Sequence, residues 1–294
     1  MSKKPDLVPS VSGGKDSTAV LILLKQKKLL HRVADIVVFD TGWEFPQMHE
    51  HWQQLEKYIG RRFTYLRPRP EPGYTGGKSP FDWQFSELPI GPKGSDDVKQ
   101  YGRGWAHPRR RWCTGRKQEA LDRHLKSLAD HHGVGLPLIK LIGFAADEVH
   151  RADQMIAEHE KRSGKTRRSS ERFFDVDFPL INYNLTETDA LQLCYDAGFY
   201  WGGLYEHFDR LSCFCCPLQG IGELKTLRRF YPDMWAKMLE MESWLPEHGH
   251  QRRFNGKLTV SDLEKRFTTE DIEEAEAARR PCQMSLFEPE ALHA

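Results

Sequence analysis

The hexapeptide Ser12-Gly13-Gly14-Lys15-Asp16-Ser17 follows a short apolar segment, Leu7-Val8-Pro9-Ser10-Val11, and precedes an amphipathic stretch from about 17 to 28. We expect the first flank to be a strand and the second to be a helix. A glycine-rich turn in this position is typical of phosphate-binding loops. The Gly-Lys-Ser/Thr ending of the Walker loop is absent, so the turn belongs to another type.

The residue types of this turn suit an anion. Glycines at 13 and 14 let backbone N–H groups come close to a ligand, and the following helix offers its positive N-terminal end. Lys15 adds a point charge, while the Ser12 and Ser17 hydroxyls add donors. Lys15 and Asp16 are our candidate catalytic residues. The alternative is an ordinary glycine turn with a serine N-cap.

Predicted strands and helices alternate along the first two thirds of the chain. The strands are expected at 7–11, 34–39, 63–66 and 139–144, and the helices at 17–28, 47–59, 114–132, 152–161 and 186–197. Such alternation predicts an α/β fold with a doubly wound, mostly parallel sheet. Pro9 predicts an edge position or an early end for the first strand. Thr186 is the expected N-cap of the last helix, with Asp189 near its N3 position.

The alternation fails between residues 67 and 108, which are rich in Pro, Gly and aromatic side chains. A long loop within a compact domain is usually functional, so we interpret it as a lid over a substrate. The prediction is a first domain over 1–220 that contains this lid-like insertion. A helical C-terminal region over 221–267 and a tail over 268–294 follow it.

Composition and charge narrow the class of protein. The chain has 294 residues, of which 39% are hydrophobic and 29% charged, as expected for a globular protein. No apolar stretch is long enough for a membrane span, and the N-terminus lacks an apolar signal segment, so we expect a cytoplasmic protein without membrane contact. The net charge is only +1, but residues 98–118 contain seven Lys or Arg and no acid. That segment suits a polyanion; a solvated loop face is the alternative.

Five ordered motifs resemble one known family. Ser12–Ser17 resembles the signature of the PP-loop ATP pyrophosphatase superfamily, also described as adenine nucleotide alpha hydrolase-like. The later motifs resemble its phosphoadenosine-phosphosulfate (PAPS) reductase branch. They are Asp40-Thr41-Gly42-Trp43-Glu44-Phe45, Cys113-Thr114-Gly115-Arg116-Lys117, the stretch from Gly143 to Arg151 that includes Glu148, and Leu204-Tyr205 followed by Cys213-Phe214-Cys215-Cys216-Pro217. The resemblance covers roughly residues 7–220.

The resemblance implies a fold and a ligand class. Members fold as a doubly wound sheet and bind ATP, PAPS or adenosine phosphosulfate. By this resemblance Asp40, with Thr41 and Gly42, approaches the adenosine end of the nucleotide. Lys15 and Arg151 contact phosphate or sulfate. The loop Ser12–Ser17 and the strand-end residues Gly143 and Glu148 complete the expected nucleotide site, and Mg²⁺ is a further candidate ion.

The cysteines predict metal chemistry. Three of the six, Cys213, Cys215 and Cys216, fall within four positions, and Cys113 lies at a predicted helix start beside several arginines, which favour a thiolate there. Converging thiolates suit a [4Fe–4S] cluster, with Zn²⁺ as the alternative ion. The cluster-type reductases use a Cys-Cys pair upstream, whereas this chain has Trp112 before Cys113.

Two ligand arrangements therefore remain open. Cys215 could be the fourth cluster ligand, or three cysteines could bind the cluster and leave one iron open, as in some tRNA thiolation enzymes that the family resembles. The alternative is that these cysteines are buried small hydrophobic residues.

The C-terminal segment contains two further features. Arg280-Pro281-Cys282-Gln283 does not match the tail motif with the nucleophilic cysteine of PAPS reductases, so Cys282 is interpreted as a passive thiol. Gln283-Met284-Ser285-Leu286-Phe287 resembles the pentapeptide that docks bacterial sliding clamps, with Gln283, Leu286 and Phe287 as anchors. Alternatively, these apolar side chains pack back on the domain.

Three functions follow from these motifs. The first is an enzyme that binds ATP, adenylates an acceptor with release of pyrophosphate and passes sulfur through a cluster; the acceptor could be a nucleic acid. The second is a reductase of PAPS or adenosine phosphosulfate, disfavoured by the missing tail motif. The third is a non-catalytic sensor of nucleotides or redox state that has kept the fold.

Overall fold

The computed structural model describes residues 4–69, 73–74, 76–92, 97–109, 111–131, 133–165, 174–247, 252–254 and 257–279, with only the backbone of 159–165. Its centre is a five-stranded sheet in the order β3-β2-β1-β6-β7, and all its pairings are parallel. The strands are β1 (Leu7–Val11), β2 (Val37–Phe39), β3 (Thr64–Leu66), β6 (Leu138–Leu141) and β7 (Phe174–Asp177).

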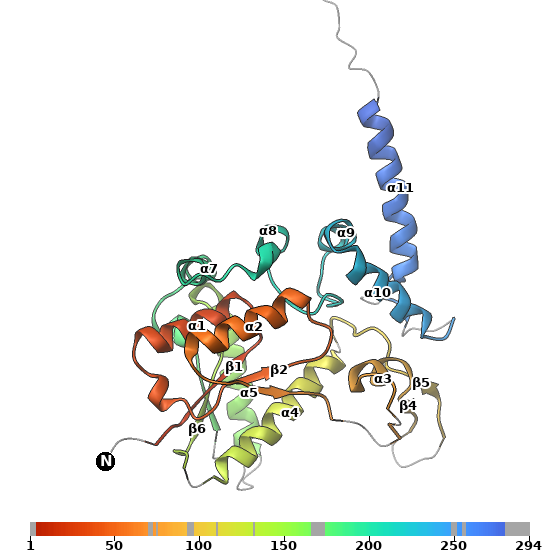
Figure 1. Cartoon of the computed structure of the whole chain (residues 1–294). Helices are drawn as coiled ribbons and strands as arrows, with labels where there is room; N and C mark the ends of the chain where they lie inside the picture. Colours follow the sequence, from red (N-terminus) through yellow and green to blue (C-terminus); the bar gives the residue numbers. More distant parts are fainter. Residues whose placement is uncertain are drawn as a thin grey trace, which may run out of the picture.

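Helices cover both faces of this sheet (Figure 1). On one side lie α1 (Lys15–Gln26) and α2 (Pro46–Ile59), with α6 (Pro179–Asn182) and α7 (Glu187–Asp196) packed on α1; on the other lie α4 (Trp112–Ala129) and α5 (Val149–Lys165). This is the predicted doubly wound α/β fold. None of the described helices is both long and apolar enough to span a membrane.

Successive side chains of β1 point to opposite faces of the sheet, and this alternation explains why helices pack on both faces. Val8 packs with Leu121 and Leu125 of α4 on one face, whereas Val11 belongs to the larger core that contains the apolar residues of α1 and α2 on the other. A strand that buries side chains on both faces is the type expected inside a parallel sheet. The prediction that Pro9 marks an edge is wrong. β1 is central, and its pairing with β2 is at Ser10 and Val11, beyond the proline.

The segment 67–108 has structure of its own. It contains α3 (Pro80–Ser86), β4 (Pro89–Ile90) and β5 (Gln100–Tyr101), which lie beside the sheet in Figure 1. Phe81 and Phe85 are fully buried, and both make edge-on ring contacts with Trp43, at 4.9 and 5.8 Å between centroids. The aromatic residues that broke the helix–strand pattern therefore form a small core that attaches this insertion to the β2–α2 turn.

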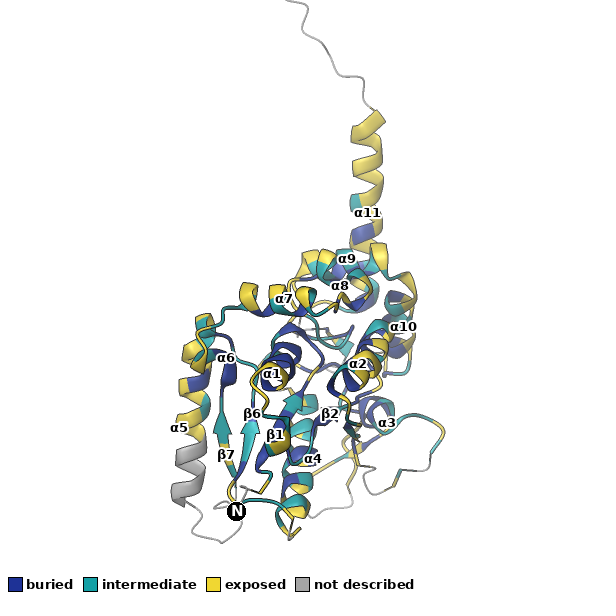
Figure 2. Ribbon diagram, turned by 60° about the vertical axis from the view of Figure 1, so that its left-hand side comes forward, coloured by how far each residue is buried: buried dark blue, intermediate teal, exposed yellow. Residues whose placement is uncertain are grey.

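The C-terminal region is helical, as expected. The short η4 (Trp201–Gly203) and α8 (Leu204–His207) lead to α9 (Ile221–Phe230), α10 (Pro232–Ser243) and α11 (Val260–Arg279). Figure 2 shows the first turns of α11 partly buried and the rest exposed. Phe267 is buried but Ile272 is 55% exposed. The helix thus continues past residue 267, where the sequence predicts that a tail begins.

Residues 280–294 lie outside the described residues. The predictions for Cys282 and for the clamp-docking residues Gln283, Leu286 and Phe287 fall in that part of the chain. The structure therefore leaves both as predictions.

The N-cap of α7 gives a test of the local prediction. Thr186 accepts a hydrogen bond from the Asp189 N–H, and the Asp189 carboxylate accepts one from the Thr186 N–H, which completes a capping box. Thr186→Ala removes the cap and should lower the free energy of unfolding by about 1 kcal/mol in urea denaturation. Thr269→Ala, at an exposed position inside α11, removes no cap and should not lower it, because Ala has a higher helix propensity than Thr. Equal losses in the two variants would contradict the capping role.

Candidate functional site

The sheet order places a crevice at the end of β1. The chain turns to β2 on one side of β1 and to β6 on the other, so the order reverses at this strand. Ligands of open α/β sheets bind outside the carboxyl ends of the strands at such a point. A cavity of about 470 Å³ lies there, and residues from the ends of β1, β2 and β6 line it.

The phosphate loop reaches this cavity under tight steric constraint. Gly13 has φ +88°, and a Cβ there would come within 2.3 Å of Trp52 Nε1. Gly143, after β6, touches the backbone of Asp16, because a Cβ on it would lie 2.7 Å from the Asp16 carbonyl carbon. Only glycine fits at these two positions. The packing fixes the start of α1 against the end of β6, so that the helix N-terminus faces the crevice.

The two serines of the loop form its internal hydrogen bonds. Ser17 Oγ accepts from the Gly13 N–H and donates to the Gly14 carbonyl, both at 3.1 Å, and it lies 3.2 Å from Ser12 Oγ. Both serines line the cavity together with Asp16. The loop therefore presents hydroxyls to the cavity in addition to the helix end.

Lys15 points elsewhere. Its ammonium binds Glu187 Oε2 at 2.6 Å, at the start of α7, and its backbone N–H donates to the Tyr205 hydroxyl at 2.6 Å. Lys15 is buried but does not line the cavity. The lysine that the sequence assigns to the phosphates thus lies behind the loop, where Glu187 holds it.

Asp16 is the titratable group of the loop. Burial, followed by the repulsion of Glu187 and Glu148, raises its pKa to about 6 against the attraction of Lys15. Its Oδ1 atom is buried and has no hydrogen-bond partner within the described part of the chain. Ionisation of the Asp16 carboxylate therefore lowers the free energy of unfolding.

The stretch from Gly143 to Arg151, which follows β6, forms another part of the cavity lining. Arg151 is ion-paired with Glu148, and its guanidinium lies 4.4 Å from the centroid of the Phe144 ring. All three residues line the cavity. Arg111 and Arg210, which the sequence did not single out as ligands, also line it. Arg111 belongs to the basic segment 98–118 that suits a polyanion, whereas the signal for Arg210 was its position three residues before Cys213.

The four predicted metal ligands lie on the same cavity. Cys113 stands in the first turn of α4, while the Cys216 N–H donates to the Cys213 carbonyl at 3.1 Å and so closes the turn that carries Cys215. All four line the cavity that the phosphate loop also lines. Residues 100 positions apart are thus brought together around one cavity, as the prediction requires.

Burial keeps the metal-free thiols protonated. It raises the pKa of Cys213 to about 12 and the pKa of Cys215 well above its usual value. The expectation that arginines favour a thiolate at Cys113 is wrong, because burial raises its pKa and Lys117 is the charged group that lowers it. Such thiols become ligands when a metal binds the thiolate and the proton is released to solvent.

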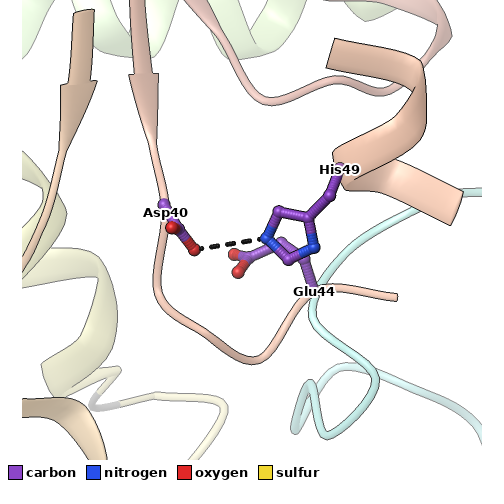
Figure 3. Close-up of side chains that lie close together, drawn as sticks. All are labelled: Asp40, Glu44 and His49. Carbon is purple, nitrogen blue, oxygen red and sulfur yellow. Dashed lines mark hydrogen bonds and ion pairs between the residues drawn. The ribbon is translucent and has the colours of Figure 1, made fainter. Parts of the chain in front are cut away.

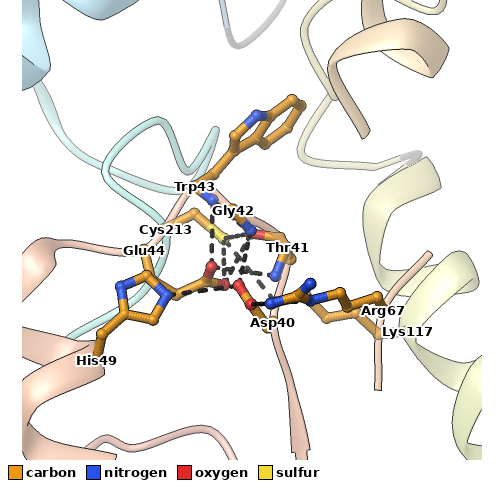
Figure 4. A network of polar contacts seen from close by, with 9 residues as sticks. All are labelled: Asp40, Thr41, Gly42, Trp43, Glu44, His49, Arg67, Lys117 and Cys213. Atoms are coloured by element: carbon orange, nitrogen blue, oxygen red, sulfur yellow. Dashed lines mark hydrogen bonds and ion pairs between the residues drawn. The ribbon is translucent and has the colours of Figure 1, made fainter. Parts of the chain in front are cut away.

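Cys213 is the centre of a partly buried polar network that includes Lys117 (Figure 4). The Lys117 ammonium lies 3.8 Å from Cys213 Sγ, and that sulfur lies 3.8 Å from Glu44 Oε1 and 3.7 Å from Thr41 Oγ1. Burial lowers the pKa of Lys117, but the nearby Glu44 carboxylate helps to raise it above its ordinary value, so the side chain remains a cation. A cation beside a cluster of thiolates offsets their negative charge.

Asp40, Glu44 and His49 group closely beside this network (Figure 3). Their ligand atoms lie within 4.8 Å of one another, a spacing that no other trio of His, Cys, Asp or Glu shows in the described part of the chain. Yet Glu44 accepts from the Thr41 N–H and hydroxyl, and Asp40 Oδ2 pairs with Arg67 at 3.1 Å. With these oxygens already bound, we interpret the group as the hydrogen bonding that shapes the β2–α2 turn.

The structure brings together part of the predicted site. Along the cavity lie Ser12, Asp16, Ser17, Gly143, Glu148, Arg151, Cys113, Cys213, Cys215 and Cys216; outside its lining lie Gly13, Gly14, Lys15, Asp40, Thr41 and Gly42. Trp105 and Ala106 of the lid-like insertion also line it. The insertion therefore contributes to the wall of the cavity.

The donor set fits an iron–sulfur cluster. Soft thiolates are the ligands of such clusters and of zinc. The four cysteines that line the cavity can supply three or four thiolates, which is the number that such a cluster requires.

The fold and the cavity define a nucleotide-binding class of α/β protein with thiols at the site. Residues 6–219 match the model of the phosphoadenosine phosphosulfate reductase domain, and the chain belongs to that family. An uncharacterised protein of Methanocaldococcus jannaschii is 26% identical over 239 residues, which are 80% of this chain. The chain spans 41% of the length of that relative.

A solved structure is also similar to the chain. It is the U34-tRNA thiolase NcsA from Methanococcus maripaludis with its [4Fe-4S] cluster, with 12% identity and a TM-score of 0.40 over 90% of this chain and 82% of that one. A likeness at this level carries no information about activity.

Because the pKa of Asp16 is raised, replacing this residue should increase the free energy of unfolding by an amount that depends on pH. The native state penalises the ionised carboxylate, so the penalty is complete above about pH 6 and vanishes below the ordinary value of 3.8. Asp16→Asn should raise the free energy of unfolding by about 1–2 kcal/mol at about pH 8 and by much less at about pH 4. Denaturant titrations at the two pH values measure this. A gain that is larger at the acidic pH would contradict the burial of the carboxylate.

Proposed function

We propose that this protein binds an adenine nucleotide in the cavity at the end of β1, adenylates an acceptor and directs sulfur to it with the help of an iron–sulfur cluster. One observation carries the proposal. The loop residues Ser12, Asp16 and Ser17 and the four cysteines line a single cavity. Phosphate-binding and thiol groups in one cavity would allow activation and sulfur transfer without release of the activated acceptor.

The phosphates are expected at the start of α1. The N-terminal end of that helix and the hydroxyls of Ser12 and Ser17 offer donors, and Arg151 supplies a fixed charge from another part of the cavity lining. Lys15, paired with Glu187 behind the loop, adds positive potential without touching the cavity. These groups would stabilise the negative charge that grows on pyrophosphate as it leaves.

The proposed reaction has two displacements. An acceptor oxygen attacks the α-phosphorus of ATP, the bond to the β-phosphate breaks, and pyrophosphate leaves. A hydrosulfide-class donor then attacks the activated carbon of the acceptor, and AMP departs with the oxygen. Lys117 and Glu44 keep the region around Cys213 polar and hold its sulfur in place.

The cysteines would hold the cluster. Cys113, Cys213 and Cys216 are the proposed ligands, and Cys215 either completes the set or leaves one iron open. When bound, the cluster would supply redox chemistry and a place for sulfur to bind. Lys117 would offset its negative charge.

Reduction of a sulfonucleotide is the second candidate. The family match over residues 6–219 favours it. The absence of the reductase tail motif around Cys282 disfavours it.

Product analysis separates the candidates. The protein, reconstituted anaerobically with iron and sulfide, is incubated with ATP, PAPS or adenosine phosphosulfate. We expect pyrophosphate from ATP when a suitable acceptor is present, and Ser17→Ala should slow its release because the loop loses a donor. Sulfite from a sulfonucleotide and a thiol would select the reductase. If neither pyrophosphate nor sulfite forms under any condition, a sensor that only binds nucleotides is the remaining candidate.

Iron content tests the cysteine assignment. Cys216→Ser removes a proposed ligand and should abolish most of the bound iron, the acid-labile sulfide and the visible absorbance of the anaerobically purified protein. Cys282→Ser makes the same chemical change at a cysteine that is not a proposed ligand and serves as the matched control. A colourless wild type, or equal iron in the two variants, would contradict the assignment.

A further inference from the structure

A second cavity lies on the flank of the phosphate loop. It has a volume of about 760 Å³ and is lined by α2, the turn after it, and β3, the edge strand of the sheet. Asp40, at the end of β2, closes one side. We call it the α2–β3 groove. Its volume is that of a site for a molecule the size of one or two nucleotides.

The charges of the groove are mainly positive. Four cationic side chains and two carboxylates line it. Glu56 is 7% exposed and bound to Arg62, and Asp40 is 8% exposed and bound to Arg67. The cations are outermost, with the Arg62 side chain 92% and the Arg67 side chain 71% exposed. The groove thus presents arginines to solvent and keeps their carboxylate partners beneath.

Asp40 positions Arg67. Both the Nε and the Nη2 atoms of Arg67 donate to Asp40 Oδ2, at 3.2 and 3.1 Å. The other oxygen, Oδ1, accepts from the Gly42 N–H at 3.0 Å and lies 3.5 Å from His49 Nε2. A guanidinium that is held by two of its nitrogens has a fixed direction. Such an arrangement suits recognition of a phosphate.

Aromatic rings line the groove together with these cations. The Tyr65 ring is 38% exposed and stands edge-on to Trp52, at 6.0 Å between centroids. His49 packs edge-on to the same indole at 5.0 Å. Since Trp52 is buried, it anchors both rings while Tyr65 remains open to a ligand. Exposed rings alternating with arginines and lysines are the features that bind unpaired bases and their phosphates.

The groove and the nucleotide cavity share a partition. Asp40 lines the groove, whereas Glu44, four residues later in the same turn, lines the nucleotide cavity. Trp52 of the groove stands directly against Gly13 of the phosphate loop. A chain of nucleotides in the groove therefore runs along the flank of the loop.

We propose that the α2–β3 groove binds single-stranded nucleic acid, with Lys57, Arg62 and Arg67 on its phosphates and Tyr65 stacked on a base. The inference rests on the proposed function, for which it identifies the acceptor class. Unpaired strands are favoured over a duplex because the groove offers a ring to a base face, which pairing hides.

Binding of fluorescent oligo(U) and oligo(dT) of equal length, followed by anisotropy over a series of salt concentrations, tests the groove. For single strands the slope of log affinity against log salt falls by about 0.7 for each phosphate that the protein no longer neutralises. Lys57→Gln/Arg62→Gln should therefore reduce the slope by about 1.4 and weaken binding roughly tenfold or more at low salt. Tyr65→Leu should weaken binding roughly five- to a hundredfold with little change of slope.

Lys265→Gln/Arg266→Gln is the matched control. It removes one lysine and one arginine from α11, and Arg266, like Arg62, is paired with a glutamate. Binding by the control should equal that of the wild type. Equal losses in the two double variants, or wild-type binding by both groove variants, would overturn the proposal, and thermal melting verifies that each variant is folded. A preference between the two oligonucleotides identifies RNA or DNA as the natural strand.

Two further measurements separate this proposal from the proposed function. Calorimetric binding of ATP should be unchanged in the groove variants, because none of the altered residues lines the nucleotide cavity. If oligonucleotides bind through the groove but no pyrophosphate is released, the result would contradict the adenylation reaction and leave the groove assignment standing. Pyrophosphate release that persists in groove variants, with unaltered oligonucleotide affinity, would contradict the groove alone.

Discussion

The close approach of the β6 end to the phosphate loop is the constraint on which the rest of the site depends. Gly143 touches the backbone of Asp16, and Gly13 touches the Trp52 indole, so the loop is held from both sides with no room for a Cβ. That contact directs the start of α1 at the crevice where the strand order reverses. Any side chain at either glycine would displace the helix end that is expected to bind the phosphates.

Burial determines the chemistry of the surrounding groups. It raises the pKa of Asp16 and the pKa values of the Cys113, Cys213 and Cys215 thiols. When a buried group is costly to ionise, a ligand that offsets the cost of its charge gives the largest gain in free energy. Under the proposed function, a charged nucleotide at the loop and a metal cluster at the cysteines would occupy one cavity, where each would influence the other electrostatically.

The sequence predicted the fold well because local patterns carry it. The apolar run of β1 and the Thr186–Asp189 cap are local signals, and both are found. β7, with the sequence Phe-Asp-Val-Asp, was missed because a run of four residues is too short for its apolar–polar alternation to stand out. The convergence of Cys113 with the 213–216 turn was predictable only from family resemblance. The pairing of Lys15 with Glu187, 172 residues away, has no local signal at all.

A crystal structure with a non-hydrolysable ATP analogue tests the central claim most directly. The account predicts triphosphate oxygens within hydrogen-bonding distance of the Ser12 and Ser17 hydroxyls and of the first N–H groups of α1, with the cysteine sulfurs bordering the same cavity. An analogue bound elsewhere on the chain, with the loop unoccupied, would contradict it.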